Sequence, residues 1–312
     1  MTEGYELLIA AVAAGGIRAA VPLFLAALGE VFAERSGVIN LGIEGVMLVG
    51  AVTGVAATLY AGSPWAGVVA AALVGAGLAA CHGAAVVWFG VNQIASGIAI
   101  IVLGTGLSGL VGIDYVGRTF EGFPILPVPV LSDIPFLGTV LFRHDALTYL
   151  TFAAIPAGWW LLYRTRWGLE MRAVGDDAEA AAAIGLDVRT LRTSAVVFGG
   201  ALAGVAGAYL SLAYSQLWQE NMVAGRGLIA LALVVFGGWM PGRVYLGALI
   251  FGTISAVQLR LQTIGGSAIS PFLLATLPYV LTIAVLVWTS RLSSLGLGGA
   301  PRELGRAFTK GR

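Results

Sequence analysis

Residues Gly37 to Tyr60 read GVINLGIEGVMLVGAVTGVAATLY, a mostly apolar run with a single charged side chain, that of Glu44. A helix needs about 20 predominantly apolar residues to cross the hydrocarbon core of a bilayer. This stretch therefore predicts a membrane-spanning helix. It also raises the question of why a carboxylate lies within it.

The rest of the chain has the same apolar character. Hydrophobic residues make up 58% of the 312 residues and charged residues 11%, whereas soluble domains average about 25% charged residues. We therefore expect an all-α polytopic membrane protein with a single transmembrane domain over residues 1–312. The net charge of +1 gives no reason to expect a nucleic-acid partner. Cys81 is the sole cysteine, which excludes a disulfide framework and a cysteine-based metal site.

Apolar segments of sufficient length recur along the chain. We predict nine membrane spans, near 7–29, 37–60, 65–90, 94–113, 147–163, 195–217, 227–240, 244–263 and 271–290. The segment 227–240 is short enough to be re-entrant or a broken helix, so eight to ten spans fit the sequence. Many of the 45 glycines lie at small-xxx-small spacing, for example Gly200 with Gly204, which lets helix backbones approach closely in lipid.

Three hydrophilic segments set the sidedness. Residues 114–146 contain FPILPVPVLSDIPF, whose prolines favour an extended or turn-rich loop. Residues 164–192 and the tail 291–312 are rich in arginine, which places both in the cytoplasm by the positive-inside rule. Four predicted spans separate these two segments, so the assignments agree. Counting back along the chain makes 114–146 an external loop and places the N-terminus outside.

The loop 164–192 contains a candidate helix, in the stretch RAVGDDAEAAAAIGLDVRTLR from Arg172 to Arg192. Asp176 precedes Glu179 by three residues, the spacing of a capping box. The alanines that follow favour a helix of about two turns, and Gly185 supplies its end. A helix this short is marginal in water by itself. It either docks on a partner or is an ordinary capped loop helix, and composition leaves both open.

Three stretches in order give a family resemblance. EAAAAIG, Glu179 to Gly185, resembles the EAA-x-x-x-G loop of ABC importer permeases. The surrounding GLEMRAVGDDAEAAAAIGLDV with GGALAGVAGAYLSL, and GRGLIALALVVFGGWMPGRVYLGALIFG at 225–252, resemble the permeases of ribose, branched-chain amino acid and nucleoside importers. ERSGVINLGIEGVMLVGA at 34–51 is most similar to the nucleoside branch. The resemblance covers about residues 15 to 290.

The resemblance implies a coupling helix that seats in a cleft of a separate ATPase subunit. The matching ATPase-coupling residues are Arg172, Gly175, Asp176, Glu179, Ala180, Ala181 and Gly185. It implies as partners the ATPase subunits, a second, paralogous permease in a heterodimer, and a substrate-binding lipoprotein. The implied location is the inner (cytoplasmic) cell membrane of a bacterial-type cell, as a multi-pass protein.

The chain itself is expected to bind no cofactor or metal and to carry no catalytic residue. ATP and Mg²⁺ are expected on the partner ATPase subunits. A P-loop requires a lysine after a glycine-rich turn, and the one lysine here, Lys310, follows no such turn.

Ionisable side chains inside spans are costly and default to functional hypotheses. Arg18 interrupts the first span and His82 the third, where a packing role is the simpler interpretation of the histidine. Arg260 lies near the external end of a late span, where its head group can reach the interface.

Four polar residues are the candidate translocation path. Asn40 and Glu44 are four residues apart and so are expected to share one helix face, and Asn92 and Gln93 mark the turn between the third and fourth spans. Glu44 either contacts cargo or clamps two helices together. An arginine of the first hairpin, at position 18 or 35, is a possible partner for it, and the sequence leaves these alternatives open.

We therefore expect the permease subunit of an ABC importer for nucleosides, with ribose or branched-chain amino acids as alternative cargo. A secondary transporter driven by an ion gradient needs intramembrane carboxylates, and Glu44 is the only one clearly inside a span. An intramembrane enzyme needs a convergent catalytic set, and the sequence has neither HExxH nor GxSxG. Both of these classes are remote alternatives.

Overall fold

The computed structural model describes residues 2–263 and 299–306, with 276–277, 280, 283–284 and 287 between them. Within these residues, seven helices are long and apolar enough to cross a membrane. They are α1 (Thr2–Arg35), α2 (Ile43–Ala61), α3 (Pro64–Gly83), α4 (Gln93–Gly112), α6 (Ala146–Arg164), α9 (Val188–Tyr209) and α11 (Pro241–Thr263). They confirm the prediction of an all-α polytopic membrane protein, to which the structure adds one small β-hairpin.

Two predicted spans are not among these seven helices. The segment 227–240 forms only the short helix α10 (Arg226–Phe236), as its length suggested. Most of 271–290 and of the tail 291–312 lies outside the described residues, so the count of nine spans stays a prediction.

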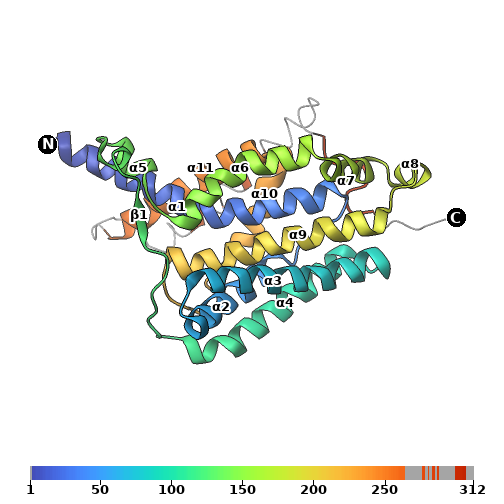
Figure 1. The fold of residues 1–312 in the computed structure, drawn as a ribbon, viewed down its shortest axis with the longest axis horizontal. Coiled ribbons are helices and arrows are strands. Elements are labelled where there is room, and N and C mark those ends of the chain that lie inside the picture. The colour runs from blue at the N-terminus through green and yellow to red at the C-terminus, as the bar shows by residue number, and fades with distance from the viewer. Residues whose placement is uncertain are drawn as a thin grey trace.

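Shorter elements gather at the two ends of the helix bundle (Figure 1). At one end lie α7 (Arg166–Asp176), α8 (Ala178–Ala183) and the described part of the C-terminal tail, and we call this the α8 end. At the opposite end, the hairpin end, the N-terminus lies beside α5 (Leu137–Leu141) and β1 (Ile125–Pro127). The predicted cytoplasmic and external segments therefore lie at opposite ends.

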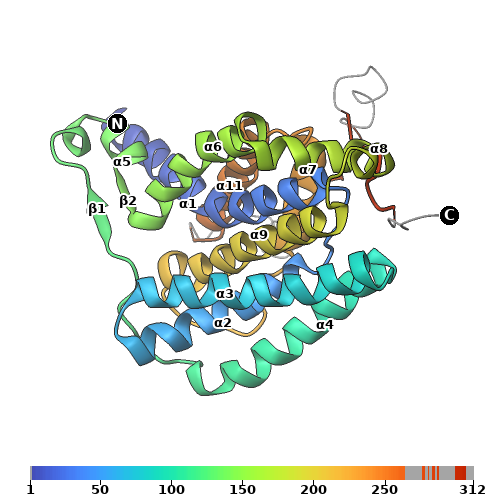
Figure 2. The same cartoon turned by 45° about the vertical axis from the view of Figure 1, so that its right-hand side comes forward.

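The proline-rich segment at the hairpin end is partly structured. It contains the 3-10 turns η2 (Ile113–Tyr115) and η3 (Leu131–Asp133), and β1 pairs antiparallel with β2 (Arg143–Asp145). The 34 residues of α1 span about 51 Å, more than the hydrocarbon thickness of about 30 Å. The first turns of α1 thus extend beyond the other helices, and α5 packs against α1 (Figure 2).

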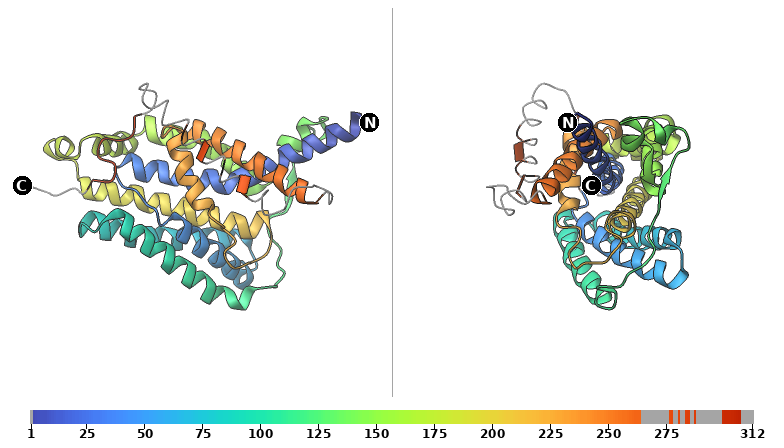
Figure 3. Two further views of the ribbon diagram at one scale, coloured as in Figure 1. Left: turned by 180° about the vertical axis from the view of Figure 1, so that it is seen from behind. Right: turned by 90° about the vertical axis from the view of Figure 1, so that its left-hand side faces the viewer.

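Helix α9 lies at the centre of the bundle and packs on α1, α2 and α3, as the views from behind and along the long axis show (Figure 3). Five-residue π-helical segments extend α3 (η1, Ala84–Trp88) and α9 (η4, Leu210–Tyr214). Gly204 of α9 permits a close approach to α3, because a Cβ there would meet the carbonyl of Ala71. Small residues thus bring these backbones into contact, as expected in lipid.

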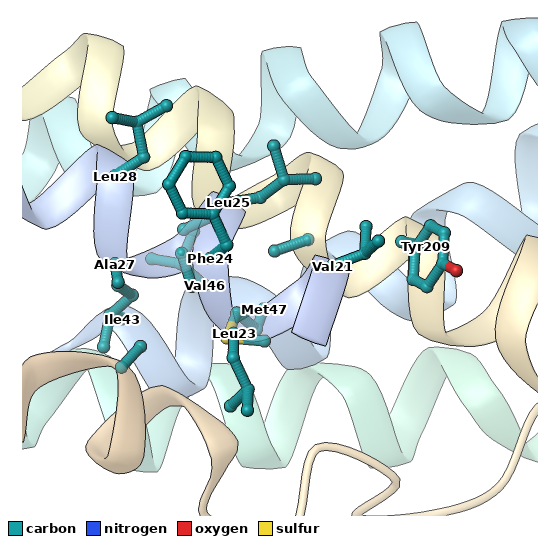
Figure 4. Close-up of a cluster of buried hydrophobic side chains, with 14 of the residues drawn as sticks. Val21, Leu23, Phe24, Leu25, Ala27, Leu28, Ile43, Val46, Met47 and Tyr209 are labelled. Atoms are coloured by element: carbon teal, nitrogen blue, oxygen red, sulfur yellow. The ribbon is translucent and has the colours of Figure 1, made fainter. Parts of the chain in front are cut away.

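Large apolar side chains fill the space between α1, α2 and α9. Phe24 of α1, Met47 of α2 and Tyr209 of α9 lie together in this core (Figure 4). The outer face of α4 instead exposes Val102 and Leu110. A helix that is apolar all round belongs in a membrane, where its outer face meets lipid.

Candidate functional site

Glu44 lies at the start of α2 and caps another helix of the bundle. Its Oε1 accepts a hydrogen bond from the Gly225 backbone N–H at 2.7 Å, and its Oε2 accepts one from the Gly227 N–H at 2.7 Å. These amides are at the N-terminus of α10, where backbone donors lack partners within the helix. A carboxylate there also stabilises the positive end of the helix dipole. Glu44 thus joins two helices through the backbone of the second.

The cap lies inside the bundle rather than at its surface. Gly45 packs directly on Ile100 of α4, about 10 Å along that helix from its start at Gln93. The start of α4 lies at the α8 end of the bundle (Figure 1). Backbone groups at this depth in a membrane need partners from the protein, because the hydrocarbon offers none. The carboxylate in the apolar run supplies two of these partners.

Helix α10 is a half-helix that runs from this cap to the α8 end. Its 11 residues span about 16 Å, roughly half of the hydrocarbon thickness. Beyond its last residue, the indole Nε1 of Trp239 donates to Glu34 Oε2 at 2.5 Å. The guanidinium of Arg35 reaches the carbonyl of Gly238 at 3.5 Å. Both partners belong to the last turn of α1, so each end of α10 is anchored to another helix.

Asn40 lies in the turn that precedes α2. Its Oδ1 accepts from the Gly42 N–H at 3.0 Å, and its own N–H donates to Glu30 Oε1 at 2.7 Å. The prediction that Asn40 and Glu44 occupy one helix face is wrong, because α2 begins only at Ile43. The short Asn side chain bonds the backbone two residues on and so favours a turn over a helix.

The turn between α3 and α4 is held by similar bonds. Asn92 caps α4 by accepting from the Ala95 N–H at 3.0 Å. Gln93 accepts the Ile39 N–H through its Oε1 at 2.8 Å. His82 contacts the hydroxyl of Ser96 at 2.9 Å, and its other ring nitrogen contacts the same Ile39 at its carbonyl oxygen at 3.1 Å. The histidine is therefore a packing residue with both nitrogens engaged, as the simpler interpretation had it.

The structure thus brings Asn40 and Gln93 together at the turn between α1 and α2, with Glu44 deeper in the bundle and Asn92 exposed. Each of the four bonds to backbone groups. Their assignment to the translocation path stays a prediction. Neither Arg18 nor Arg35 is a hydrogen-bond partner of Glu44, since their guanidinium groups donate to the carbonyls of Ala213 and Gly238.

The predicted short helix at the α8 end is present, with a different cap. α8 covers Ala178–Ala183, and its N-cap is Asp177, whose Oδ1 accepts from the Ala180 N–H at 2.9 Å. Asp176 is the last residue of α7 and cannot cap α8, which corrects the predicted capping box. Gly185 has φ of +92° and ends the helix as predicted, since glycine adopts this conformation without a Cβ penalty.

Helix α8 buries one side and exposes the other. Ala178 and Ala181 pack with Val174 and Val188 in a small cluster beneath it. The outer side forms an exposed ridge that ends in Ile184, whose side chain is 77% exposed. The members of this ridge are Glu179, Ala180, Ala183 and Ile184. Ile184 was missed by sequence reasoning, although an apolar residue just before the helix-ending glycine is a signal for it.

The other predicted coupling residues support the ridge from below. Arg172 bonds the carbonyl of Leu162 at 3.2 Å, and its guanidinium lies 4.8 Å from the ring centroid of Tyr163. Gly175 is buried because the carbonyl of Arg35 lies against its Cα. The predicted set therefore divides into an exposed part and an inward part. The inward part comprises Arg172 and Gly175 of α7 and Ala181 of α8, and the exposed part comprises Asp176, Glu179, Ala180 and Gly185.

The tail returns to the same end of the bundle. The N–H of Glu303 donates to the Gly175 carbonyl at 2.9 Å, and the N–H of Gly305 donates to the Gly37 carbonyl at 3.1 Å. The buried guanidinium of Arg192 lies 3.8 Å from the Glu303 carboxylate. The tail segment 301–306 therefore ties α7, α9 and the turn after α1 together.

The hairpin end has a buried polar network of its own. Asp145 caps α6 through the Thr148 N–H at 2.9 Å, and the Thr148 hydroxyl lies 3.1 Å from that of Tyr209. Beside this network, burial lowers the pKa of His144, so its imidazole is expected to be neutral at neutral pH. Arg18 lines a neighbouring cavity of about 700 Å³ between α1 and the hairpin.

Known proteins resemble this chain along most of its length. Residues 12–290 match the family described as the permease component of branched-chain amino acid transport systems. The chain is 42% identical over 291 residues to a putative glucose ABC transporter permease of Haloferax volcanii, covering 86% of this chain and 88% of that protein. It is 33% identical over 307 residues to a guanosine ABC transporter permease of Bacillus subtilis, covering 94% of each. It is 32% identical over 303 residues to a nucleoside ABC transporter permease of Lactococcus lactis, covering 93% and 94%.

Proposed function

Because the chain belongs to the family of branched-chain amino acid transport permeases, and so is the permease subunit of an ABC transporter, we propose that its cargo is a nucleoside. A solute-binding protein delivers the nucleoside to the hairpin end, and separate ATPase subunits drive its import. The observation that carries the cargo assignment is the identity of about a third, over nearly the whole chain, to two permeases named for guanosine and nucleosides.

The exposed ridge of α8 is the observation that favours a surface for binding the ATPase subunit. A helix of six residues is too short to persist in water by propensity alone. Here it is fixed by the Asp177 cap and by the cluster under Ala178 and Ala181, and its ridge is left to face a partner. We assign the predicted coupling residues to this interface, with Glu179, Ala180 and Gly185 in contact with the ATPase. Arg172 and Gly175 position α7 beneath it.

The sidedness of the proposal follows from arginine content. The α8 end carries the arginine-rich loop 164–192 and the described part of the tail, so it faces the cytoplasm. The N-terminus and the hairpin then face outward, in the inner (cytoplasmic) membrane of a bacterial-type cell. No ATP site is assigned to this chain, and a second, paralogous permease completes the transport path.

A sugar is the second candidate cargo. It is favoured by the 42% identity to a protein named as a putative glucose permease, which exceeds the identity to the two permeases named for guanosine and nucleosides. Nucleosides and sugars share a ring that bears hydroxyl groups, so both fit a permease for neutral polar cargo. A direct competition experiment separates them.

The test is uptake of radiolabelled guanosine by cells or vesicles that hold the complete transporter. We expect unlabelled nucleosides to compete and glucose, ribose and leucine to have little effect. Competition by glucose alone would assign the chain to sugar import, and competition by leucine alone would assign it to amino acid import. A transporter without this chain, but with all other subunits, is the control for background uptake.

A further inference from the structure

A cavity of about 300 Å³ lies between α1, α10 and α11, at the start of the half-helix α10. Arg226, which lines it, lies between the two glycines that Glu44 caps. Small-molecule sites begin at about this volume. In secondary transporters, cargo sites typically form where a helix is interrupted near the middle of the bilayer, and α10 likewise begins inside the bundle. The cavity therefore has the position and the volume expected of a cargo site.

The cavity is oriented toward the hairpin end. α1 and α11 run antiparallel, since Gly16 of α1 packs against Thr253 of α11 and Gly15 packs against Ala256. Of the lining residues, Gln262 belongs to the last turn of α11 at the hairpin end. Leu23 lies at the inner part, about 18 Å along α1 from its end at the α8 end. The cavity thus extends from the middle of the bundle toward the proposed outer side.

The lining separates polar from apolar groups. Leu23, Ile229 and Phe251 form an apolar inner wall. Ser255 and Gln258 of α11 add a hydroxyl and an amide. The Ser255 hydroxyl donates to a carbonyl of its own helix at 3.0 Å, which leaves its oxygen able to accept a further bond. Gln258 has no hydrogen-bond partner among the described residues, so its amide can donate and accept.

The charges of the lining narrow the class of cargo. Arg226 is the one charged residue among the described residues of the lining, and its Nη1 donates to the carbonyls of Met222 and Val223, each at 3.0 Å. Among the described residues that line the cavity there is no carboxylate, so none of them pairs with the ammonium group of an amino acid. A neutral cargo with hydrogen-bonding groups at one end and a flat apolar part at the other matches the two walls.

We propose that this cavity holds the nucleoside during translocation, with Gln258 and Ser255 bonding its polar groups and its base against the apolar wall. The identity of the cargo rests on the proposed function, whereas the location of the cargo site rests on the cavity alone. Glu44 is then a positioning residue, because it fixes the start of α10 and with it Arg226. The predicted path residues Asn40, Asn92 and Gln93 do not line this cavity.

Thiol labelling tests the location without reference to cargo identity. In the complete transporter with Cys81→Ala, we expect a Ser255→Cys thiol to react with a water-soluble methanethiosulfonate added from outside. The matched control is Val257→Cys on the same helix, which is exposed on the outer face and absent from the lining, so it is expected to lie in lipid and stay unlabelled. Gln258→Cys is the second variant should Ser255→Cys not assemble. Labelling of Val257→Cys alone, or of none of these thiols, overturns the proposal.

Transport tests the role of the amide. With saturating loaded binding protein, we expect Gln258→Leu to lower the guanosine uptake rate about threefold to tenfold, the effect of losing one hydrogen bond. ATPase stimulation by the loaded binding protein should persist, and Leu261→Ala, an exposed residue outside the lining, should transport normally. Unchanged uptake in Gln258→Leu with guanosine as a confirmed cargo overturns the cavity assignment. If the wild type imports only glucose and Gln258→Leu impairs that import, the cavity assignment stands and the nucleoside assignment falls.

Discussion

Replacing Glu44 by glutamine tests whether the carboxylate is a helix cap. Glu44 accepts two backbone N–H groups, one on each oxygen, at 2.7 Å each. In Glu44→Gln one oxygen becomes an NH₂ group, which cannot accept and faces a donor. One bond to a charged acceptor, worth about 1.5–3 kcal/mol, is lost. The charge at the start of α10 is lost as well, and this loss destabilises the fold by a further amount of at most about 2 kcal/mol in a partly buried setting.

The expected loss of stability is therefore about 2–5 kcal/mol. At roughly 2–4 °C per kcal/mol for domains of 150–250 residues, the unfolding midpoint should fall by about 4–20 °C. The assay is thermal unfolding of the purified transporter in detergent, followed by size-exclusion chromatography of the heated sample. Glu121→Gln is the matched control, because Glu121 is an exposed carboxylate in the loop at the hairpin end.

Glu44→Asp completes the series. The shorter side chain keeps the charge but is expected to reach only one of the two amides, so its midpoint should lie between those of the wild type and Glu44→Gln. A Glu44→Gln transporter with a wild-type midpoint and an altered preference among cargoes would refute the capping argument. Such a result would assign Glu44 to direct contact with cargo.

Substitutions at three further sites, two of them with a matched comparison, test other contacts. Gly185→Leu should abolish co-purification of the ATPase while the permease is still inserted in the membrane. Gly185→Asn should retain more of the ATPase, because Asn tolerates positive φ and is smaller. Equal co-purification with both variants would count against a docking role. Gly207→Val forces a side chain against a backbone carbonyl of α2 and should lower the free energy of unfolding by about 1–3 kcal/mol or more, as measured by thermal unfolding. Gly77→Val is the control and should be nearly neutral, because a Cβ at Gly77 meets no atom within 4 Å. Glu303→Gln leaves the buried Arg192 guanidinium without its carboxylate and should lower the unfolding midpoint by the equivalent of about 1–3 kcal/mol. An unchanged midpoint would show that this ion pair adds nothing to stability.

Local features of the sequence predicted local features of the structure. The apolar length of each segment predicted seven spanning helices and the short eighth helix, because crossing a bilayer sets a length that a sequence displays directly. Gly185 was identified as a helix end because the left-handed conformation favours glycine. The cap was placed one residue early since Asp176 and Asp177 are adjacent, and only the end of α7 at Asp176 decides between them.

Contacts distant in sequence were not predictable from it. Glu44 and the backbone N–H groups that donate to it are separated by 181 and 183 positions along the chain. No local pattern links a carboxylate in one helix to the amides that begin another. The sequence carries a weak signal of the cavity, since Gln258 and Gln262 are four residues apart in a late apolar helix and so share one face.

The half-helix α10 connects the two regions that an importer must couple. Gly175 at the base of α8 packs on the carbonyl of Arg35, and the guanidinium of Arg35 reaches Gly238 just after α10. At the other end of α10, Glu44 holds the helix start beside the cavity. A displacement of the α8 end therefore has a rigid element of about 16 Å through which to act on the cavity. On this view the carboxylate in the apolar run of α2 fixes one end of that element. A polar group that is costly to place in a membrane is retained there because it lets a helix begin halfway across.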